Sequence, residues 1–480
     1  MKAIAAVLDK KGGNAVPKIA SMLSVLGCRG ADAYCVATPN GTAINVSLET
    51  FPRELKASTA LGQVFIKVLA GDKPKLTTLE NSAFLFDGRI YNPSMECLDA
   101  FTARSLQAGC DVLALAEALI KEFDGCFAFA IAEEETLVVG RDALGLYPLY
   151  YGETSDLFAV ASECKVLWKM GVDEVKTLSP GHLLIVNGSG FQTRRVKSPE
   201  SHVKPWFPGE AVEELQSLLL QSAYERTASL DRVAVAFSGG LDSSLAALLV
   251  QKAGVEVHLI HVSLENQRET FQAQEAARLL GLPFHKFLYR VEDVERVLPE
   301  VLWCVESADP LKTSIAIPLF WAAEKAAELG FKVLLAGHGA DELFGGYRRY
   351  LALYARFGES VAQEAVTFDI MRMHDENFER DFKVCVFHNV ELRLPFASYP
   401  IVEFALSLPL NLKIASKEDF LRKFVLRKTA EKLGLPKQIV YKPKRAMQYA
   451  TGVDKALRML ARKRNLPLKQ YLAEIFQGLW

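Results

Sequence analysis

Short apolar runs, separated by turn residues, recur along the first two hundred residues of the chain. They lie at 126–132, 136–141, 146–152, 157–162 and 182–187. Runs of this length between turn residues predict β-strands. Helical patterns stand out only around residues 14–26 and 111–122. We therefore expect an antiparallel, β-rich unit with a few helices.

The pattern changes after a polar, proline-containing segment at residues 196–210. Predicted strands at 232–237, 255–262, 284–289 and 331–337 then alternate with predicted helices at 243–254, 269–281, 292–305 and 314–330. Such alternation predicts βαβ units and a parallel sheet, and the chain beyond about residue 348 is predicted to be mostly helical. We expect two domains, residues 1–200 and 206–480, with an overall fold class of α+β followed by α/β.

Composition and charge exclude several classes of protein. The chain has 56 Lys and Arg against 57 Asp and Glu, so a global polyanion-binding surface is not expected. No apolar run reaches the roughly 18 residues of a membrane span, and the early charges do not resemble a secretion signal. The eight cysteines form no C-x-x-C pair, which predicts buried free thiols in a reducing cytoplasm.

The sharpest local motif follows a predicted buried strand and opens a predicted helix. It contains Ser238, Gly239, Gly240, Asp242, Ser243 and Ser244. The two glycines let bare N–H groups face an anion, and the helix start and the serine hydroxyls add positive potential and donors. Asp242 repels a phosphate unless it holds a Mg²⁺ that bridges phosphate oxygens. The motif is not a Walker loop and looks like the pyrophosphatase loop of enzymes that form adenylates. An ordinary capped strand–turn–helix is the alternative.

Two further segments add candidate chemistry. Residues 336–347 form a glycine-rich segment after another predicted strand, and Asp341 is a candidate second Mg²⁺ carboxylate because ligands bind at the carboxyl edge of open α/β sheets. A turn with a helix-capping Asp is the alternative. Residues 413–470 hold seventeen Lys and Arg against four Asp and Glu. Such a run is typical of a solvated helical face, and a polyanion-binding surface is the other interpretation.

Together these motifs resemble those of glutamine-dependent asparagine synthetases. The matching segments are 28–32, 87–93, 123–131, 140–152, 161–167, 238–244, 336–347, 390–409 and 441–449. The resemblance implies an N-terminal Ntn-type, class II glutaminase-like antiparallel β-sandwich with helices. It further implies a C-terminal PP-loop (HUP-like) parallel α/β synthetase domain with a helical C-terminal part.

The glutaminase half departs from that family. The family uses a cysteine that is exposed as residue one after loss of the initiator methionine. Here the second residue is Lys2, whose bulk should also keep Met1 in place. The family's N-G-E becomes Asp87-Gly88-Arg89, and its T-G-S-D-[TC]-E segment has no counterpart before residue 111. We expect a sandwich that has lost its chemistry.

The synthetase half keeps most of the family's positions. By resemblance, Phe237 and Val262 frame the adenine of ATP, Ala336 and Gly337 contact the nucleotide, and Asp242 and Asp341 hold Mg²⁺. Lys444 matches a loop lysine that stabilises the transfer step. His338 replaces a family glutamate, and His338 and Glu391 are candidate proton carriers, although His338 as a plain loop residue is the alternative.

The expected function is an ATP-dependent, AMP- and pyrophosphate-forming amide ligase without its own glutaminase. It would adenylate aspartate or another acid and transfer it to ammonia or another amine. Leu394–Ser398 lacks a family carboxylate, which leaves both substrates open. An RNA-modifying adenylating enzyme and a non-catalytic nucleotide-binding regulatory protein remain alternatives. We expect small-molecule partners and no membrane, leave a homodimer open, and do not expect nucleic acid although the basic segment keeps it open.

Overall fold

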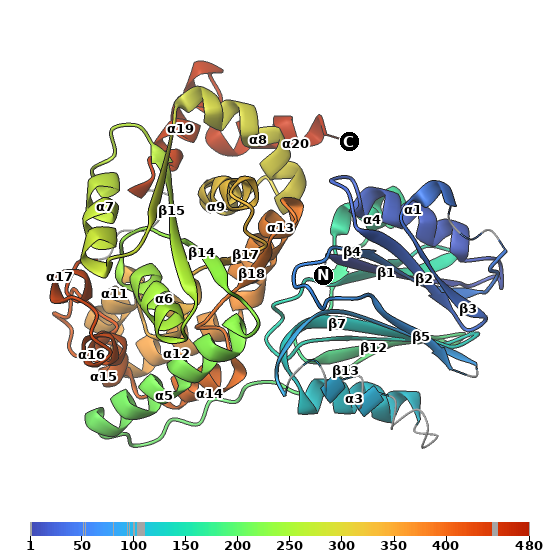
Figure 1. Cartoon of the computed structure of the whole chain (residues 1–480), viewed down its shortest axis with the longest axis horizontal. Coiled ribbons are helices and arrows are strands. Elements are labelled where there is room, and N and C mark those ends of the chain that lie inside the picture. The colour runs from blue at the N-terminus through green and yellow to red at the C-terminus, as the bar shows by residue number, and fades with distance from the viewer. Residues whose placement is uncertain are drawn as a thin grey trace. The chain divides into compact units, whose positions relative to one another are not determined.

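The computed structural model describes residues 2–50, 52, 54–79, 81–93, 95, 97–98, 101–102, 111–443 and 450–479. The chain divides into two compact units, residues 1–198 and 199–480 (Figure 1). Across the described ranges, no helix is long and apolar enough to cross a membrane.

Two antiparallel sheets form the first unit within the described residues. One has the strand order β11 (Lys176–Thr177), β9 (Tyr150–Glu153), β10 (Leu157–Ala161), β1 (Ala3–Asp9), β4 (Thr59–Phe65), β2 (Ala33–Thr38) and β3 (Gly41–Asn45). The other has the order β13 (Gly190–Arg195), β12 (His182–Asn187), β8 (Leu137–Arg141), β7 (Asp124–Ala132), β6 (Ser82–Asn92) and β5 (Lys75–Leu79).

Helices cover the outer faces of these sheets. Helices α1 (Val16–Leu26) and α4 (Cys164–Lys169) share an apolar core with the first sheet, and α3 (Val112–Glu122) shares one with the second. A short 3₁₀ helix spans Leu48–Thr50. Figure 1 shows the resulting helix–sheet–sheet–helix layers, so the predicted antiparallel sandwich with helices is confirmed.

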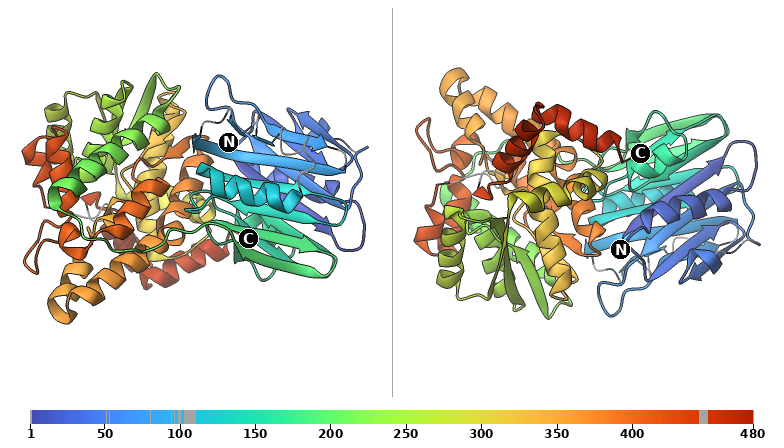
Figure 2. Two further views of the ribbon diagram at one scale, coloured as in Figure 1. Left: turned by 90° about the horizontal axis from the view of Figure 1, so that it is seen from below. Right: turned by 90° about the horizontal axis from the view of Figure 1, so that it is seen from above.

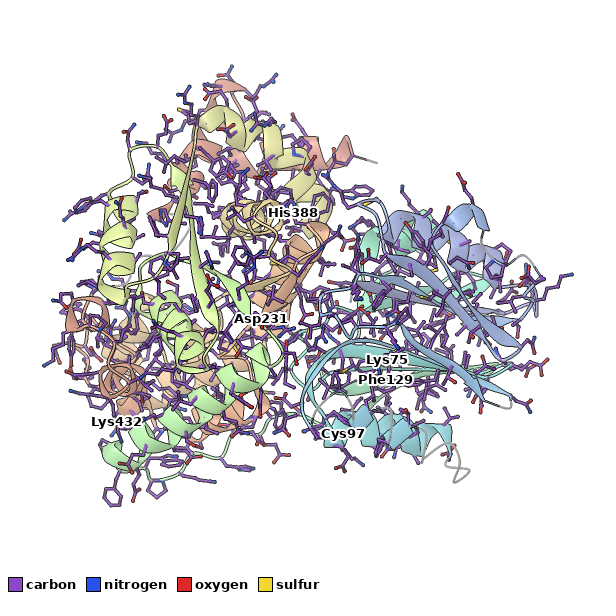
Figure 3. The ribbon with its side chains drawn as sticks, in the orientation of Figure 1. Lys75, Cys97, Phe129, Asp231, His388 and Lys432 are labelled. Atoms are coloured by element: carbon purple, nitrogen blue, oxygen red, sulfur yellow. The ribbon has the colours of Figure 1, made fainter. Side chains whose placement is uncertain are left out.

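Close packing in this unit depends on small residues opposite large ones. The ring of Phe129, labelled in Figure 3, is fully buried on β7. A Cβ on Gly140 of the neighbouring strand would lie 2.2 Å from that ring, so only glycine leaves room for it. Interiors this dense lose stability when even one methyl group is added without space.

One predicted strand, 146–152, is only partly a strand, because the structure places β9 at Tyr150–Glu153. The preceding turn is held by the buried carboxylate of Asp142, which accepts hydrogen bonds from the N–H groups of Leu144, Leu146 and Tyr147 at 3.1, 3.0 and 2.9 Å. Backbone N–H groups that bond to a side chain are not available for a sheet ladder.

The second unit is built on a parallel sheet with the order β16 (Phe284–Tyr289), β15 (Glu256–Leu264), β14 (Arg232–Ala236), β17 (Val333–Leu335) and β18 (Glu391–Arg393). The helices described in this unit are α5 (Pro208–Thr227), α6 (Leu241–Lys252), α7 (Arg268–Leu280), α8 (Val291–Val305), α9 (Pro310–Glu328), α10 (Ala340–Leu343), α11 (Arg348–Phe357), α12 (Glu359–Met371), the π-helix η2 (His374–Phe378), α13 (Glu379–Phe387), α14 (Tyr399–Ser407), α15 (Leu410–Lys413), α16 (Phe424–Lys432), α17 (Lys437–Val440), α19 (Val453–Lys463) and α20 (Leu468–Gln477). Figure 2 shows these helices around the sheet.

The strand order reverses direction at β14. The chain moves outward from β14 to β15 and β16, and then returns to β17 on the other side of β14. Right-handed crossovers therefore place α6 and α7 on one face of the sheet and α8 and α9 on the other. The carboxyl ends of β14 and β17 form the point of reversal, which is where open α/β sheets bind their ligands. The predicted α/β class of this unit is confirmed.

Candidate active site

Both glycine-rich loops leave the sheet at its point of reversal. Strands β14 and β17 pair in parallel, with Ala234 opposite Leu334. The segment 238–240 follows β14 and leads into α6, and the segment 336–339 follows β17 and leads into α10. The two loops therefore begin side by side at the carboxyl edge, as the sequence predicts.

The first loop turns tightly against a neighbouring helix. Gly239 has a φ of +67°, and a Cβ there would lie 2.6 Å from the Cα of Ala273 on α7. The hydroxyl of Ser243 accepts a hydrogen bond from the Ser238 N–H at 3.2 Å, and the Gly240 N–H donates to the Ser238 hydroxyl at 3.3 Å. The first turn of α6 leaves N–H groups without intrahelical partners, so this loop presents an anion-binding surface.

The second loop passes directly against the start of α6. A Cβ on Gly337 would lie 2.7 Å from the carbonyl carbon of Asp242 and 2.9 Å from the N of Ser243. Only glycine permits this approach, because backbone atoms cannot give way as a flexible side chain can. The two predicted loops are thus in contact.

Asp242 and Asp341 converge on one cation, the ammonium of Lys423. Its Nζ lies 2.6 Å from Asp242 Oδ1 and 2.7 Å from Asp341 Oδ1, and the lysine side chain is only 2% exposed. Burial lowers the pKa of Lys423, and the charge of Asp242 opposes that shift. A Cβ on Gly346 would lie 2.0 Å from Asp341 Oδ1, so the second glycine-rich segment leaves space for this triad.

The contacts of Asp242 and Asp341 with Lys423 indicate which kind of ion the two carboxylates could bind. Two carboxylates, from the first turns of α6 and α10, already share one positive charge, and carboxylate oxygens are ligands that a divalent cation such as Mg²⁺ prefers. Asp242 and Asp341 therefore fit such an ion, which would compete with the Lys423 ammonium for the same two carboxylate oxygens.

Lys423 was not among the site residues predicted from the sequence. It lies within the basic segment 413–470, where charge counting alone cannot separate a buried lysine from solvated ones. Lys442 of the same segment donates a hydrogen bond to the Gly239 carbonyl at 3.3 Å. The guanidinium of Arg427 donates hydrogen bonds to the carbonyls of Leu421 and Arg422, at 2.7 and 2.8 Å. The segment 421–442 thus contacts the first loop. Lys444 lies outside the described residues.

His338 has a fixed partner. Its Nδ1 lies 2.5 Å from Oδ2 of Asp381, which is fully buried on α13. The other carboxylate oxygen accepts a hydrogen bond from Arg380 Nε at 2.8 Å. Burial raises the pKa of Asp381, but Arg380 and His338 outweigh burial and hold the pKa below its usual range.

Glu391 lies apart from the loops. It is buried on β18 opposite Val333, at the amino-terminal end of β17, whereas the loops leave the carboxyl ends. Its Oε1 lies 2.6 Å from Arg393 Nε, and Arg393 Nη1 donates to the carbonyl of Arg226 at the end of α5 at 2.7 Å. These contacts tie β18 to α5, and the role of Glu391 as a proton carrier stays a prediction.

The residues expected to frame a nucleotide lie at the same edge as the loops. The Phe237 N–H donates to the Ile260 carbonyl at 2.8 Å, and the Phe237 carbonyl accepts from His261 Nδ1 at 2.9 Å. Val262 is buried on β15, and the Ala336 N–H donates to the Arg393 carbonyl at 3.2 Å. Phe237 and Ala336 directly follow β14 and β17.

The second unit has a parallel sheet with two glycine-rich loops at its point of reversal. This arrangement is typical of α/β proteins that bind ligands at the carboxyl edge of the sheet. Comparison with known proteins narrows the class: the asparagine synthase family matches residues 214–362 and 355–476, and a glutamine amidotransferase domain matches residues 61–169. The chain belongs to the asparagine synthase family.

Several relatives support this placement. A Methanocaldococcus jannaschii protein, provisionally named asparagine synthetase [glutamine-hydrolyzing] 1, is 32% identical over 402 residues, which cover 74% of each chain. The root asparagine synthetase of Pisum sativum is 30% identical over 80% of this chain and 69% of its own length. A glutamine phosphoribosylpyrophosphate amidotransferase from B. subtilis has 17% identity and a TM-score of 0.34 over 60% of this chain and 81% of its own, too low to support any conclusion.

Lys423→Met tests the buried triad. Removing the ammonium leaves two partly buried carboxylates facing each other, so the free energy of unfolding should fall by about 3–5 kcal/mol. Lys432→Met is the matched control, because this lysine is exposed and pairs with Glu213 at the surface, and it should cost less than about 1 kcal/mol.

Thermal unfolding with and without added Mg²⁺ distinguishes the loss of the Lys423 charge from the loss of its packing. A divalent cation that binds the folded state raises its stability, and in Lys423→Met it meets no competing ammonium. Mg²⁺ should therefore raise the melting temperature of Lys423→Met more than that of the unmodified protein. Equal shifts in both proteins would show that the carboxylates do not form a cation site.

Proposed function

We propose that this protein is an ATP-dependent amide ligase of the asparagine synthetase type that releases AMP and pyrophosphate and has no working glutaminase. The observation that supports this most is the convergence of Asp242 and Asp341 on one cation beside the anion-binding start of α6. The acid is aspartate or another carboxylic acid, and the acceptor is ammonia or another amine.

In the proposed complex, the phosphates of ATP lie against the loop of residues 238–244 and the first turn of α6. The adenine lies beside Phe237 and Val262, and Ala336 and Gly337 contact the nucleotide. Asp242 and Asp341 would hold Mg²⁺, which would neutralise charge on the phosphate oxygens when bound.

The proposed reaction has two steps. A carboxylate oxygen of the acid attacks the α-phosphorus of ATP, and the bond to pyrophosphate breaks. The amine then attacks the acyl carbon of the adenylate, and AMP leaves. Lys442 supplies positive charge beside the first loop, where the leaving pyrophosphate requires it. We propose that Lys444 offsets charge during the transfer and that His338 accepts a proton.

Pyrophosphate release from MgATP, screened over amino acids and amines, tests this proposal. Asp242→Asn and Asp341→Asn should each lower the release by at least about 10²-fold, since each removes a carboxylate that would hold Mg²⁺ beside the phosphates. Asp231→Asn is the matched control, because Asp231 is exposed at the start of β14, the strand that leads to the loop with Asp242 (Figure 3). This variant should release pyrophosphate at the rate of the unmodified protein. Nucleotide binding without any release would instead favour a regulatory protein.

The first unit supports the proposed loss of glutaminase chemistry. Lys2 directly precedes β1 and takes the position where glutamine-dependent asparagine synthetases have their catalytic cysteine. The Lys2 side chain is buried, and Nζ donates a hydrogen bond to the Gly30 carbonyl at 2.8 Å. Asp87 accepts hydrogen bonds from the Lys2 N–H at 3.1 Å, Tyr147 Oη at 2.7 Å and Gln63 Nε2 at 2.7 Å. These groups bond to one another in the interior of the unit.

Arg89 is also engaged inside the first unit. Its guanidinium forms two parallel hydrogen bonds to Asp72, at 2.8 Å each, and both side chains are mostly buried. A bidentate pair of this kind is strong and directional. Arg89 and Asp87 therefore already have internal partners where a glutaminase needs groups for its substrate.

Glutamine should not serve as a nitrogen source. With the acid found by the screen, amide should form from ammonium chloride, and glutamine at the same concentration should give only background. The measurement is amide formation together with glutamate release, each as a function of protein concentration. Glutamate release that rises in proportion to this protein would end the proposal of a lost glutaminase.

A further inference from the structure

His261 lies buried behind the first loop, within a chain of four hydrogen bonds. Its Nδ1 lies 2.9 Å from the carbonyl oxygen of Phe237, the residue before the loop, and its Nε2 lies 3.2 Å from Thr270 Oγ1 on α7. Thr270 Oγ1 lies 2.7 Å from Ser263 Oγ, which donates a hydrogen bond to the Leu264 carbonyl at 3.0 Å. The chain therefore connects the end of β14, the end of β15 and the first turn of α7.

The number of protons in this chain fixes its direction. A backbone carbonyl only accepts, so Nδ1 of His261 carries a proton, and the single hydroxyl proton of Ser263 goes to the Leu264 carbonyl. Thr270 must then donate its own proton to Ser263, and toward His261 it can only accept. All four bonds form together only when Nε2 of His261 carries a second proton, which is the imidazolium form.

The neutral ring leaves one bond of the chain unmade. Nε2 then presents a lone pair, and the Thr270 hydroxyl donates to it. Thr270 has no second proton for Ser263, so Ser263 bonds either to Thr270 or to the Leu264 carbonyl, but not to both. Protonation of His261 therefore completes the chain.

Burial and charge oppose this protonation in the free protein. His261 is 4% exposed, and burial lowers its pKa. The hydrogen bond to Phe237 opposes that shift, whereas the charges of Lys286 and Lys442 lower the pKa further. Lys286 lies opposite His261 on the neighbouring strand β16, and Lys442 donates a hydrogen bond to the Gly239 carbonyl of the first loop.

The other groups around the ring are uncharged. Thr270 of α7 and the Phe237 carbonyl bond to its nitrogens, and the ring of Phe284 on β16 stacks on it with the centroids 5.8 Å apart. Within the described residues, the charged groups that shift the pKa of His261 are therefore both cations. An anion that offsets their charge favours the imidazolium form.

The chain lies behind the proposed phosphate site. Phe237 directly precedes the first loop, and on α7 Ala273 lies against Gly239, where a Cβ would be 2.6 Å from the Ala273 Cα. In the proposed function, on which this step rests, the triphosphate of ATP lies against this loop. Its negative charge offsets that of Lys442, and so it raises the pKa of His261.

We propose that His261 is a positioning residue for ATP and takes up a proton from solution when the phosphates of the nucleotide bind. The proton binds to the lone pair of Nε2. The Thr270 hydroxyl proton turns from Nε2 to Ser263, and Ser263 donates to the Leu264 carbonyl. The completed chain holds α7 against the strand ends that carry the first loop. ATP binding and proton binding then strengthen each other by the same factor.

Calorimetry of MgATP binding in buffers of different ionisation enthalpy measures this proton uptake. Near pH 7 the unmodified protein should take up protons with MgATP, and His261→Gln should not. Glutamine can donate to the Phe237 carbonyl and accept from Thr270, but it cannot take up a proton. As the pH falls from about 8 to about 6, the affinity of the unmodified protein should rise relative to that of His261→Gln, by up to about tenfold for each pH unit.

A second variant and two controls sharpen the test. Thr270→Val should reduce the uptake, because the second N–H of the imidazolium loses its acceptor. His258→Gln changes the other histidine of β15, which is 17% exposed and bonds to Glu256 and His285, and it should keep the uptake of the unmodified protein. Adenosine has no phosphates, so it should bind to the unmodified protein without proton uptake.

The outcomes separate the inference from the proposed function. Uptake that requires both the phosphates and His261 supports the inference. Equal uptake in the unmodified protein and His261→Gln, or equal uptake with ATP and adenosine in the unmodified protein, overturns the inference and leaves the proposed function standing. The comparison with adenosine needs no variant, so it decides even where His261→Gln does not fold. Absence of MgATP binding to the unmodified protein overturns the inference and the proposed nucleotide site together.

Discussion

The buried ammonium of Lys423 joins two carboxylates that come from the first turns of two helices of the second unit, α6 and α10. Two carboxylates this close repel each other, and without a cation at least one would tend to hold a proton. The surrounding backbone is fitted to this triad, since a Cβ on Gly346 would overlap both Asp341 and Lys423. This interaction ties the starts of α6 and α10 to residue 423 beside the proposed nucleotide site.

The buried charged side chains of the two units have different surroundings. In the second unit, Lys423 and its partners lie at the edge of the sheet where ligands bind, and the carboxylates keep about a sixth of their side-chain surface exposed, at 18% and 16%. In the first unit, Asp87 is fully enclosed and accepts three hydrogen bonds from its own fold. The first arrangement leaves carboxylate surface for a ligand, whereas the second stabilises an interior.

Local sequence patterns were sufficient for the elements that bear the loops. The strands predicted at 232–237 and 331–337 are observed at 232–236 and 333–335, and the motif at 238–244 opens α6 as expected. The pairings across the site could not be predicted. Lys423 and Asp381 reach their partners only through the tertiary fold, and nothing in the residues beside them marks burial. β18 was also missed, because a three-residue strand in a helical region carries too little periodicity.

The transfer of oxygen-18 from a labelled carboxylic acid tests the central claim most directly. If the acid attacks the α-phosphorus of ATP beside Asp242 and Asp341, one labelled oxygen remains on AMP when the amide forms. The expected result is one oxygen-18 in AMP for each amide bond made with ammonium, and no label in pyrophosphate. Label found in inorganic phosphate, or amide formed with unlabelled AMP, would contradict adenylation at this site.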